Sequence, residues 1–365
     1  MTDIGVVTMD PRFGGGATAQ TEAFEATARE LGREPELYYF AHPSLVGVEH
    51  ESRGLRAPFR RFDAGNQLAT GLRIAPRVRA ARSEWVVATL APYGYPALRS
   101  TRRYACWLGT ALEDEWAARR PGLPPSRRLA LRVNAPVLRR LERSVLRGAA
   151  RVYATSPWSR TSLARAGGLA EDEVGILPMA VDLGDFRPAP DEEWLRTIDQ
   201  PVLAFVGRAD DPRKNVSLLL DALALLPEAR ALLVGTPPHW PLPERAEAIG
   251  LVPSVAEHLR RATLYVVPSL QEGFGTAALE ALAAGVPVVS TPCGGPEDLL
   301  RESGGGVVLG GFSPEELAST VAGLLGDVAR LSAMRRSGRE YVRREHSPTR
   351  LRELMSQAFL ELDET

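Results

Sequence analysis

The sequence predicts an α/β protein built from two Rossmann-like domains, and three observations lead to this fold class. Short apolar stretches alternate with glycine-containing loops and amphipathic helices, as in parallel sheets covered by helices. A length of 365 residues exceeds the size at which a single hydrophobic core stops growing. Between two such series lies the polar, proline-flanked stretch Ala189–Gln200, which we expect to be a linker.

The clearest series is the stretch Leu264–Leu300. Its apolar runs Leu264–Pro268 and Val286–Ser290 suit strands that are buried on both faces. Thr276–Ala284, between them, is rich in alanine, leucine and glutamate, which favour a helix. The glycine loop Ser269–Gly275 precedes this helix, so it would present backbone N–H groups and the positive end of the helix dipole to an anion such as phosphate.

Two glutamates flank the start of this predicted helix. Glu272 lies in the loop and Glu280 about one turn into the helix, on the face that it shares with Thr276. A carboxylate beside a phosphate site suits hydrogen bonds from sugar hydroxyls, as does the acidic residue that holds a ribose in dinucleotide-binding folds. The alternative interpretation is an ordinary strand–helix unit with two surface glutamates.

These residues together resemble the donor site of the family-4 retaining glycosyltransferases of the GT-B fold. The resemblance rests on a Glu, seven residues and a second Glu, with EGFG opening the span and GVPVV and GGPE following it. It implies two Rossmann-like domains that face a central cleft. It also implies a hexosyltransferase-like enzyme that moves a sugar from a nucleotide-diphosphate sugar to an acceptor hydroxyl, with retention and without a metal ion.

Two basic residues follow a predicted strand at the start of the second half. Pro201–Val206 should be a buried strand, and Arg208 and Lys214 come after it, at the sheet edge where open α/β sheets bind ligands. Lys214 is the only lysine among the 44 basic residues, and all the others are arginine. This suggests that the position needs a compact point charge. The alternative is that a lysine remains there by chance. The resemblance places both cations on the donor diphosphate, where they would stabilise the charge of the leaving group.

The resemblance assigns a full set of site residues. Glu280 would hold the ribose, while Glu272 and the backbone of the GFG loop would bind the transferred sugar. No cofactor is expected, because the nucleotide-diphosphate sugar is the donor substrate. The candidates are Arg208, Lys214 and Glu272 for catalysis, and Gly15, Gly16, Val252, Gly273, Phe274, Gly275, Thr276, Ala277 and Glu280 for donor binding.

The chain departs from the family pattern in two places. The family often has a histidine near the end of the strand Arg103–Trp107, whereas this chain has none between His50 and His239. The proline-rich segment before Gly250-Leu251-Val252, the run that would frame the base, is shorter than usual. Two alternatives therefore stay open: a catalytically degenerate nucleotide-sugar-binding protein, and a GT-B nucleotide-sugar epimerase.

Strand and helix patterns along the rest of the chain give the domain organisation. We expect an acceptor-side domain at 1–188, a donor domain at 189–347 and a C-terminal helix at 348–365 that packs back on the first domain. Apolar runs predict strands at Ile4–Met9, Leu37–Phe40, Trp85–Leu90, Arg103–Trp107, Val152–Thr155 and Ala231–Val234. Helical spacing predicts helices at Thr18–Leu31, Ser156–Ala166, Val216–Leu226, Val255–Ala262, Pro314–Leu325, Val328–Glu345 and Pro348–Leu362, whereas Asp10–Gly16, Leu45–Arg61 and Ala91–Ser100 are predicted loops.

The segment Arg119–Arg151 is the most charged, with ten arginines and one acid, Glu142. We interpret it as a core-packed helix with a solvated arginine face. The alternatives are a weak peripheral contact with an anionic membrane and steering of an anionic acceptor. The adjacent acids Glu113–Glu115 suit a solvated helix start better than a metal site. The apolar residues at helical spacing are Leu129, Val133, Val137, Leu138, Leu141, Val145 and Leu146.

Composition narrows the class of protein further. A net charge of −1 gives no support for a nucleic-acid binder. The two cysteines, Cys106 and Cys293, fall in different halves and are expected to be free thiols in a reducing compartment. No apolar run reaches the ~18 residues of a membrane span, and no signal peptide is recognised. We therefore expect a cytoplasmic protein, with the inner membrane face as the alternative, and an acceptor of unknown kind: a glycan, a lipid or a small molecule.

Overall fold

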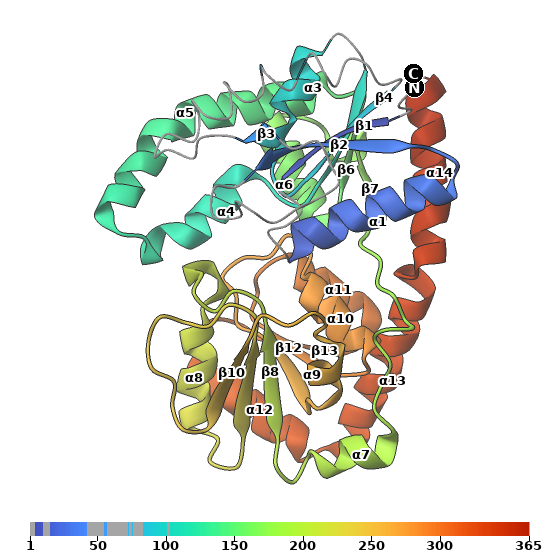
Figure 1. The fold of residues 1–365 in the computed structure, drawn as a ribbon. Coiled ribbons are helices and arrows are strands. Elements are labelled where there is room, and N and C mark those ends of the chain that lie inside the picture. The colour runs from blue at the N-terminus through green and yellow to red at the C-terminus, as the bar shows by residue number, and fades with distance from the viewer. Residues whose placement is uncertain are drawn as a thin grey trace. The chain divides into compact units, whose positions relative to one another are not determined.

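The computed structural model describes residues 4–9, 15–41, 55–56, 72, 75, 83–100 and 103–364 (Figure 1). The chain forms two compact units, one made of Met1–Ala180 with Pro348–Thr365 and the other of Val181–Ser347. Each unit is a parallel sheet with helices packed on it. The predicted loop Leu45–Arg61 lies outside the described residues except for 55–56, as do residues 10–14 of the first glycine loop.

The first unit contains a seven-stranded parallel sheet with the order β3-β2-β1-β4-β5-β6-β7. The strand order reverses between β1 and β4, as in doubly wound folds. The strands are β1 (Ile4–Met9), β2 (Pro35–Ala41), β3 (Leu55–Arg56), β4 (Ser83–Ala88), β5 (Tyr104–Leu108), β6 (Arg151–Ala154) and β7 (Val174–Ile176). The helices are α1 (Gly16–Glu30), α3 (Tyr95–Arg99), α4 (Leu112–Arg119), α5 (Pro125–Gly148), α6 (Pro157–Gly167) and α14 (Pro348–Glu364), with 3-10 turns η3 (Ala91–Gly94), η4 (Arg120–Gly122) and η5 (Glu171–Glu173).

The second unit contains a six-stranded parallel sheet with the order β10-β9-β8-β11-β12-β13, which reverses between β8 and β11. The strands are β8 (Val202–Val206), β9 (Arg230–Val234), β10 (Ala246–Gly250), β11 (Leu264–Val267), β12 (Val288–Ser290) and β13 (Gly306–Val308). The helices are α7 (Asp191–Arg196), α8 (Val216–Ala224), α9 (Ala256–Arg260), α10 (Thr276–Ala283), α11 (Gly295–Ser303), α12 (Pro314–Leu325) and α13 (Val328–Glu345), with the 3-10 turn η6 (Pro212–Lys214).

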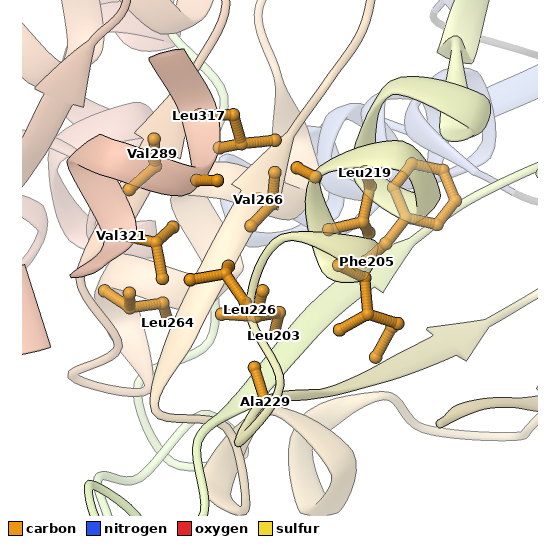
Figure 2. Close-up of a cluster of buried hydrophobic side chains, with 14 of the residues drawn as sticks. Leu203, Phe205, Leu219, Leu226, Ala229, Leu264, Val266, Val289, Leu317 and Val321 are labelled. Atoms are coloured by element: carbon orange, nitrogen blue, oxygen red, sulfur yellow. The ribbon is translucent and has the colours of Figure 1, made fainter. Parts of the chain in front are cut away.

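The core of the second unit explains why its strands are apolar at nearly every position. Figure 2 shows Leu203 and Phe205 of β8 and Val266 of β11 facing side chains of α8 and α12. Leu219 of α8 and Leu317 of α12 are fully buried in this cluster. Because helices cover the strands, the strand sequences read as continuous apolar runs rather than as alternating ones. For this reason the sequence predicted β8, β9, β11 and β12 correctly.

The structure confirms the α/β fold class and most predicted elements, and it corrects two of them. The predicted linker Ala189–Gln200 contains α7, whose Trp194 is 1% exposed and lies 4.9 Å under the guanidinium of Arg335. The predicted loop Ala91–Ser100 is η3 and α3, each with a proline in its first turn, where the missing N–H costs nothing. These short elements contain one buried tryptophan and two prolines but no extended series of apolar residues at helical spacing. The sequence therefore did not predict α7, η3 or α3.

Strand β10 was not predicted either. The segment after β9 is rich in proline and short of apolar residues, yet Ala246–Gly250 pairs with β9 as the edge strand of the sheet. An edge strand is only partly buried and needs no continuous apolar run, because its stability comes from the hydrogen bonds of one ladder.

The long helix α5 corrects the prediction of its buried face. Leu138, Leu141 and Val145 are buried as predicted. Leu129, Val133 and Val137, predicted on the same apolar face, are 62%, 57% and 45% exposed. The helix therefore carries two apolar arcs, and only one of them packs on the core of the first unit.

The adjacent acids at the start of α4 are paired rather than simply solvated. Glu113 forms an ion pair with Arg139 of α5. Asp114 accepts hydrogen bonds of 2.7 Å from Arg165 of α6. Glu115 is buried, and its Oε1 lies 2.7 Å from Nη1 of Arg119. Glu113 and Asp114 thus connect α4 to α5 and α6, whereas the pair of Glu115 lies within α4.

Helix α14 returns to the first unit, as the sequence predicted. The ring of Phe359 packs edge-on against Phe24 of α1 and Trp85 of β4, with centroid distances of 5.8 and 5.3 Å. Tyr153 of β6 also donates a 2.8 Å hydrogen bond to Glu361. A helix that is remote in sequence thus closes the core beside the first strands.

In the part of the chain that is described, no single helix is long and apolar enough to cross a membrane. Only the bent combination of Pro314–Leu325 with Val328–Asp363, at an angle of 97°, meets that requirement by length and composition.

Replacing Phe359 with alanine should lower the free energy of unfolding of the first unit by about 3–5 kcal/mol, because the removed ring leaves a cavity against two buried aromatics. Urea denaturation followed by tryptophan fluorescence would measure the loss. Leu360→Ala is the matched control, since Leu360 is 56% exposed and its loss should cost about 0.5 kcal/mol or less. Equal losses for the two variants would contradict the docking of α14 described here.

Candidate functional site

The candidate site lies where the strand order of the second sheet reverses. Strands β8 and β11 are neighbours in the sheet although β9 and β10 intervene in sequence. The loop 207–215 follows β8 and the loop 268–275 follows β11, so both leave the same carboxyl edge. In open α/β sheets this crevice is the usual place for ligands, because the two loops diverge from adjacent strands.

One main-chain and one side-chain hydrogen bond join the two loops. The N–H of Leu270 donates to the carbonyl of Arg213 at 2.8 Å. Asn215 has a left-handed backbone with φ of 47°, which asparagine tolerates better than most residues, and its Nδ2 donates to the carbonyl of Pro268 at 3.2 Å. These two bonds set the position of the residue between them, Lys214.

Lys214 and Glu272, 58 positions apart in sequence, form an ion pair. Nζ of Lys214 donates a 2.5 Å hydrogen bond to Oε1 of Glu272, which also accepts a 2.6 Å bond from Ser269. Nη1 of Arg213 lies 3.8 Å from the other carboxylate oxygen. Glu272 itself is only 8% exposed, so these partners compensate the desolvation of a buried charge.

The surroundings hold Glu272 in its ionised form. Burial by itself would raise the pKa of this carboxyl, but the charges of Lys214 and Arg213 and the hydrogen bonds from Lys214 and Ser269 lower it below its usual value. An ionised carboxylate has about four acceptor positions, so Glu272 keeps acceptor capacity for hydroxyl groups of a ligand.

The glycines of the GFG and GGPE motifs allow two backbones to meet. Gly275 has a φ of +88°, and a Cβ there would lie 2.7 Å from the ring of Pro296. A Cβ on Gly295 would lie 2.3 Å from the carbonyl oxygen of Gly273. Phe274 turns its ring inward, 8% exposed and 5.6 Å from the ring of His346, so only its backbone is available to a ligand.

Helix α10 begins directly after this loop. Among the described residues, the N–H groups of Thr276 and Ala277 have no hydrogen-bond acceptor, whereas those of Ala278 and Leu279 donate to the carbonyl of Gly275. Free amides at a helix start, together with the helix dipole, attract an anion.

Glu280, one turn further along α10, has a different environment from Glu272. Its side chain is partly buried and has no hydrogen-bond or ion-pair partner in the described part of the chain. Burial raises the pKa of this carboxyl from 4.5 to about 7. A carboxylate that is desolvated and lacks a donor is poised to accept hydrogen bonds from a ligand, which would restore its charge.

Three other groups of predicted residues take up separate positions. Arg208 follows β8 and is bound by Asp210 through hydrogen bonds of 3.2 and 2.8 Å. Val252 lies two residues beyond β10, which is separated from β8 by β9 and hence by about 10 Å. Gly15 and Gly16 belong to the first unit, at the start of α1, and the structure does not test their role.

The structure thus brings Lys214 and Glu272 together and adds two residues that sequence reasoning missed. Arg213 donates to the carbonyl and side-chain oxygens of Gln271, both at 3.2 Å, and Ser269 donates to Glu272. Both lie beside predicted residues, within the same loops, which is the only signal that the sequence carried. No group of His, Cys, Asp and Glu in the described residues is arranged to hold a metal ion, and both cysteines are free and buried.

Solved structures share this fold over the whole chain. A sucrose-phosphate synthase from Thermosynechococcus elongatus superimposes with a TM-score of 0.81 and 20% identity, over 100% of both chains. HepE of Anabaena, solved in complex with UDP and glucose, gives a TM-score of 0.74 with 16% identity over 98% of this chain and 99% of the other. At these identities the likeness concerns the fold, and it confirms the two-domain GT-B class.

Sequence relatives match about half of the chain. D-inositol 3-phosphate glycosyltransferases from Segniliparus rotundus and Nocardia farcinica are 35% and 31% identical, over 46% and 54% of this chain and 42% and 50% of theirs. The chain therefore matches about half the length of these curated relatives. Residues 200–327 match the family described as Glycosyl transferases group 1. This segment, which is similar to a glycosyl transferases group 1 domain, contains β8, β11, α10 and both site loops.

Proposed function

We propose that this chain is a family-4 glycosyltransferase that moves a sugar from a nucleotide-diphosphate sugar to an acceptor hydroxyl, with retention at the anomeric carbon. The observation that carries the proposal is the convergence of the only lysine and Glu272 at the strand reversal of a glycosyl transferases group 1 domain. The names of the relatives support a glycosyltransferase, and UDP bound to the fold neighbour HepE supports a nucleotide donor.

Lys214 is proposed to bridge the carboxylate and the donor diphosphate. Its ammonium has three N–H donors, and Glu272 takes one of them in the structure. The remaining donors can bind phosphate oxygens while Glu272 stays paired and ionised. Arg208, half exposed at the same sheet edge, would add a second cation. Both would stabilise the charge that grows on the diphosphate as the glycosidic bond breaks.

The start of α10 is proposed to bind the same diphosphate through the amides of Thr276 and Ala277, with the helix dipole adding to the two cations. These groups would neutralise the leaving group without a metal ion. Glu280 would accept hydrogen bonds from the ribose, and Glu272 and the GFG backbone would bind hydroxyls of the transferred sugar. With no side-chain nucleophile assigned, the leaving phosphate would take the proton of the acceptor.

Binding of UDP, GDP and ADP would test whether the chain has a nucleotide-binding donor site. A nucleotide at 100 times its Kd stabilises the folded protein by about 2.7 kcal/mol, which a thermal-shift assay detects. Incubation of the protein with the matching nucleotide sugar, with and without acceptor, then distinguishes transfer from epimerisation and from binding alone. Failure of all three nucleotides to shift the Tm would remove the donor-site assignment.

Arg208→Ala should lower kcat by roughly 10²–10³-fold, because one cation that stabilises the leaving diphosphate is lost. Its stability should change by about 0.5 kcal/mol or less, because Arg208 is half exposed. Steady-state kinetics with the matching nucleotide sugar and urea unfolding would measure the two effects. Kinetics within a factor of a few of the native enzyme would contradict the phosphate role.

Lys214→Ala should show the same kinetic loss together with a loss of stability of up to about 3–5 kcal/mol, since it leaves the buried Glu272 carboxylate without its main partner. The double variant Lys214→Ala/Glu272→Gln should regain most of that stability but not the activity. Recovery of activity in the double variant would show that Lys214 serves only to neutralise Glu272.

Substitutions of the two glutamates should have different effects on the affinity for the nucleotide diphosphate and for the intact donor. Glu280→Gln should weaken binding of the nucleotide diphosphate alone by roughly 10-fold or more, because a hydrogen bond to a charged acceptor is replaced by one to a neutral amide. Glu272→Gln should leave that affinity nearly unchanged and weaken only the intact donor, which carries the sugar. Calorimetry on both variants measures the difference, and equal losses with the nucleotide alone would contradict this placement of the sugar.

Glu280 should also make stability and binding depend on pH. Its folded pKa of about 7 exceeds the ordinary 4.5, so the folded state holds the proton more tightly, and stability should fall by up to about 3 kcal/mol as pH rises from 4.5 to 7. Glu280→Gln, which cannot titrate, should lack this fall. If ribose hydroxyls restore the charge, nucleotide binding at pH 7 should release about half a proton, measurable by calorimetry in buffers of different ionisation enthalpy. Identical pH profiles for the two proteins would contradict the unpaired state of Glu280.

A further inference from the structure

Helix α5 carries a second apolar arc that points away from the core. Leu129, Val133 and Val137 follow one another at intervals of four residues, so they share one side of the helix. They are 62%, 57% and 45% exposed, whereas Leu138 and Val145 on the opposite side are buried. We call the exposed side, with Leu129, Val133 and Val137 and the exposed Arg132 and Arg140 beside them, the outer α5 face. Three large aliphatic side chains in a row are more than the scattered exposure that needs no explanation.

The charge of this face is strongly positive. Helix α5 contains seven arginines, and its one acid, Glu142, is 3% exposed and accepts a 2.8 Å hydrogen bond from the N–H of Leu112. Arg132 and Arg140 are exposed beside the apolar row, and neither forms an ion pair with any residue in the described part of the chain. The face therefore combines apolar side chains with free cations, and it presents no acid of its own.

A hollow of about 290 Å³ opens along the same helix. Arg120 and Arg139 on its rim share the carboxylate of Glu113 as ion-pair partner, while Arg132 on the rim has none. The hollow thus holds three guanidinium groups against one carboxylate, which favours an anion. Its lining consists of Arg120, Leu131, Arg132, Ala135, Pro136 and Arg139.

We propose that the outer α5 face binds an anionic lipid surface, with phosphate-bearing headgroups at the arginine-lined hollow and Leu129, Val133 and Val137 in the interfacial region. A helix with an apolar row bordered by arginines lies in the plane of such an interface, because apolar burial and attraction to anionic lipid act together. Arginine stems also extend along apolar surface while their charged ends reach the headgroups.

The positive charge of the outer α5 face favours an anionic lipid surface over a second copy of the chain. A symmetric dimer through the outer α5 face would bring the arginines of both copies together without an acid of the face to compensate them. Like charges across an interface oppose association. An anionic bilayer supplies the missing negative charge, and it accepts the apolar row at the same time.

Flotation of the full chain with vesicles tests the proposal. Vesicles of phosphatidylcholine with 30–40% phosphatidylglycerol, as a rough working range for an anionic surface, should bind the protein, and binding should weaken as salt rises from about 50 to 500 mM. Pure phosphatidylcholine should bind at least roughly 10-fold less. The triple variant Leu129→Gln/Val133→Gln/Val137→Gln should lose roughly 10-fold or more of the binding, because three apolar side chains no longer enter the interface. Arg132→Gln/Arg140→Gln should lose roughly 10- to 30-fold, at about fivefold for each arginine near the surface.

Matched controls on other surfaces separate this face from general effects. Leu360→Gln removes an exposed leucine from α14, and Arg330→Gln/Arg336→Gln removes two exposed arginines from α13. All the substituted side chains are exposed, so every variant should fold, which circular dichroism and Tm confirm. Both controls should bind anionic vesicles as the native chain does.

Three results would overturn the proposal. Equal binding to neutral and anionic vesicles, or to neither, would remove the electrostatic basis. Losses in the controls as large as those in the α5 variants would show that no particular face is responsible. A dimer that forms without vesicles and is abolished by the triple variant would assign the outer α5 face to a second copy of the chain.

Discussion

The ion pair between Lys214 and Glu272 holds the candidate site together. It connects the loop after β8 to the loop after β11, which are adjacent only because the strand order of the sheet reverses between these strands. A buried carboxylate is costly unless it is paired and hydrogen-bonded, so the pair, with Ser269 and Arg213, makes the conformation of both loops mutually dependent. Gly275 and Gly295 also fix the second loop, because they let it pack against the start of α11.

The two glutamates show how one motif yields two chemical environments. Glu272 accepts hydrogen bonds from Lys214 and Ser269 and stays ionised. Glu280 is desolvated, has no donor among the described residues, and has a pKa raised to about 7. Their spacing along the chain, one in the loop and one in α10, places both carboxylates near the same loop, but it does not determine their charge. The charge of Glu272 depends on its partners, which are Ser269 of the same loop and Lys214, 58 positions away, of the other loop.

The first unit presents a related contrast on helix α5. One arc of the helix completes the core of the unit, and the other arc exposes leucine and valine beside arginines. The inner arc also carries Val145 and Leu146, whereas the outer arc carries the exposed Arg132 and Arg140. Burial of apolar surface therefore favours the inner arc, and the ion pairs of α5 and α6 with the acids of α4 join the three helices around it.

The amino-acid sequence by itself determined the alternation of strands and helices, the two-domain class and the loop in which Glu272 lies. These features depend on local periods of two and 3.6 residues, on glycine loops before helices and on continuous apolar runs in covered strands. Residues 201–206 and 264–268 could be predicted as strands for that reason, and Lys214 stood out as a single lysine.

The tertiary structure alone decided the features that depend on residues far apart in sequence. These are the pairing of Lys214 with Glu272, the burial of Trp194 in the expected linker, the pairing of β10 at the sheet edge and the outward direction of Leu129, Val133 and Val137. A helical period records that a residue is apolar and where it lies around the helix axis. It does not record which neighbour covers that side, because burial and charge pairing are set by contacts that form only when the whole chain has folded.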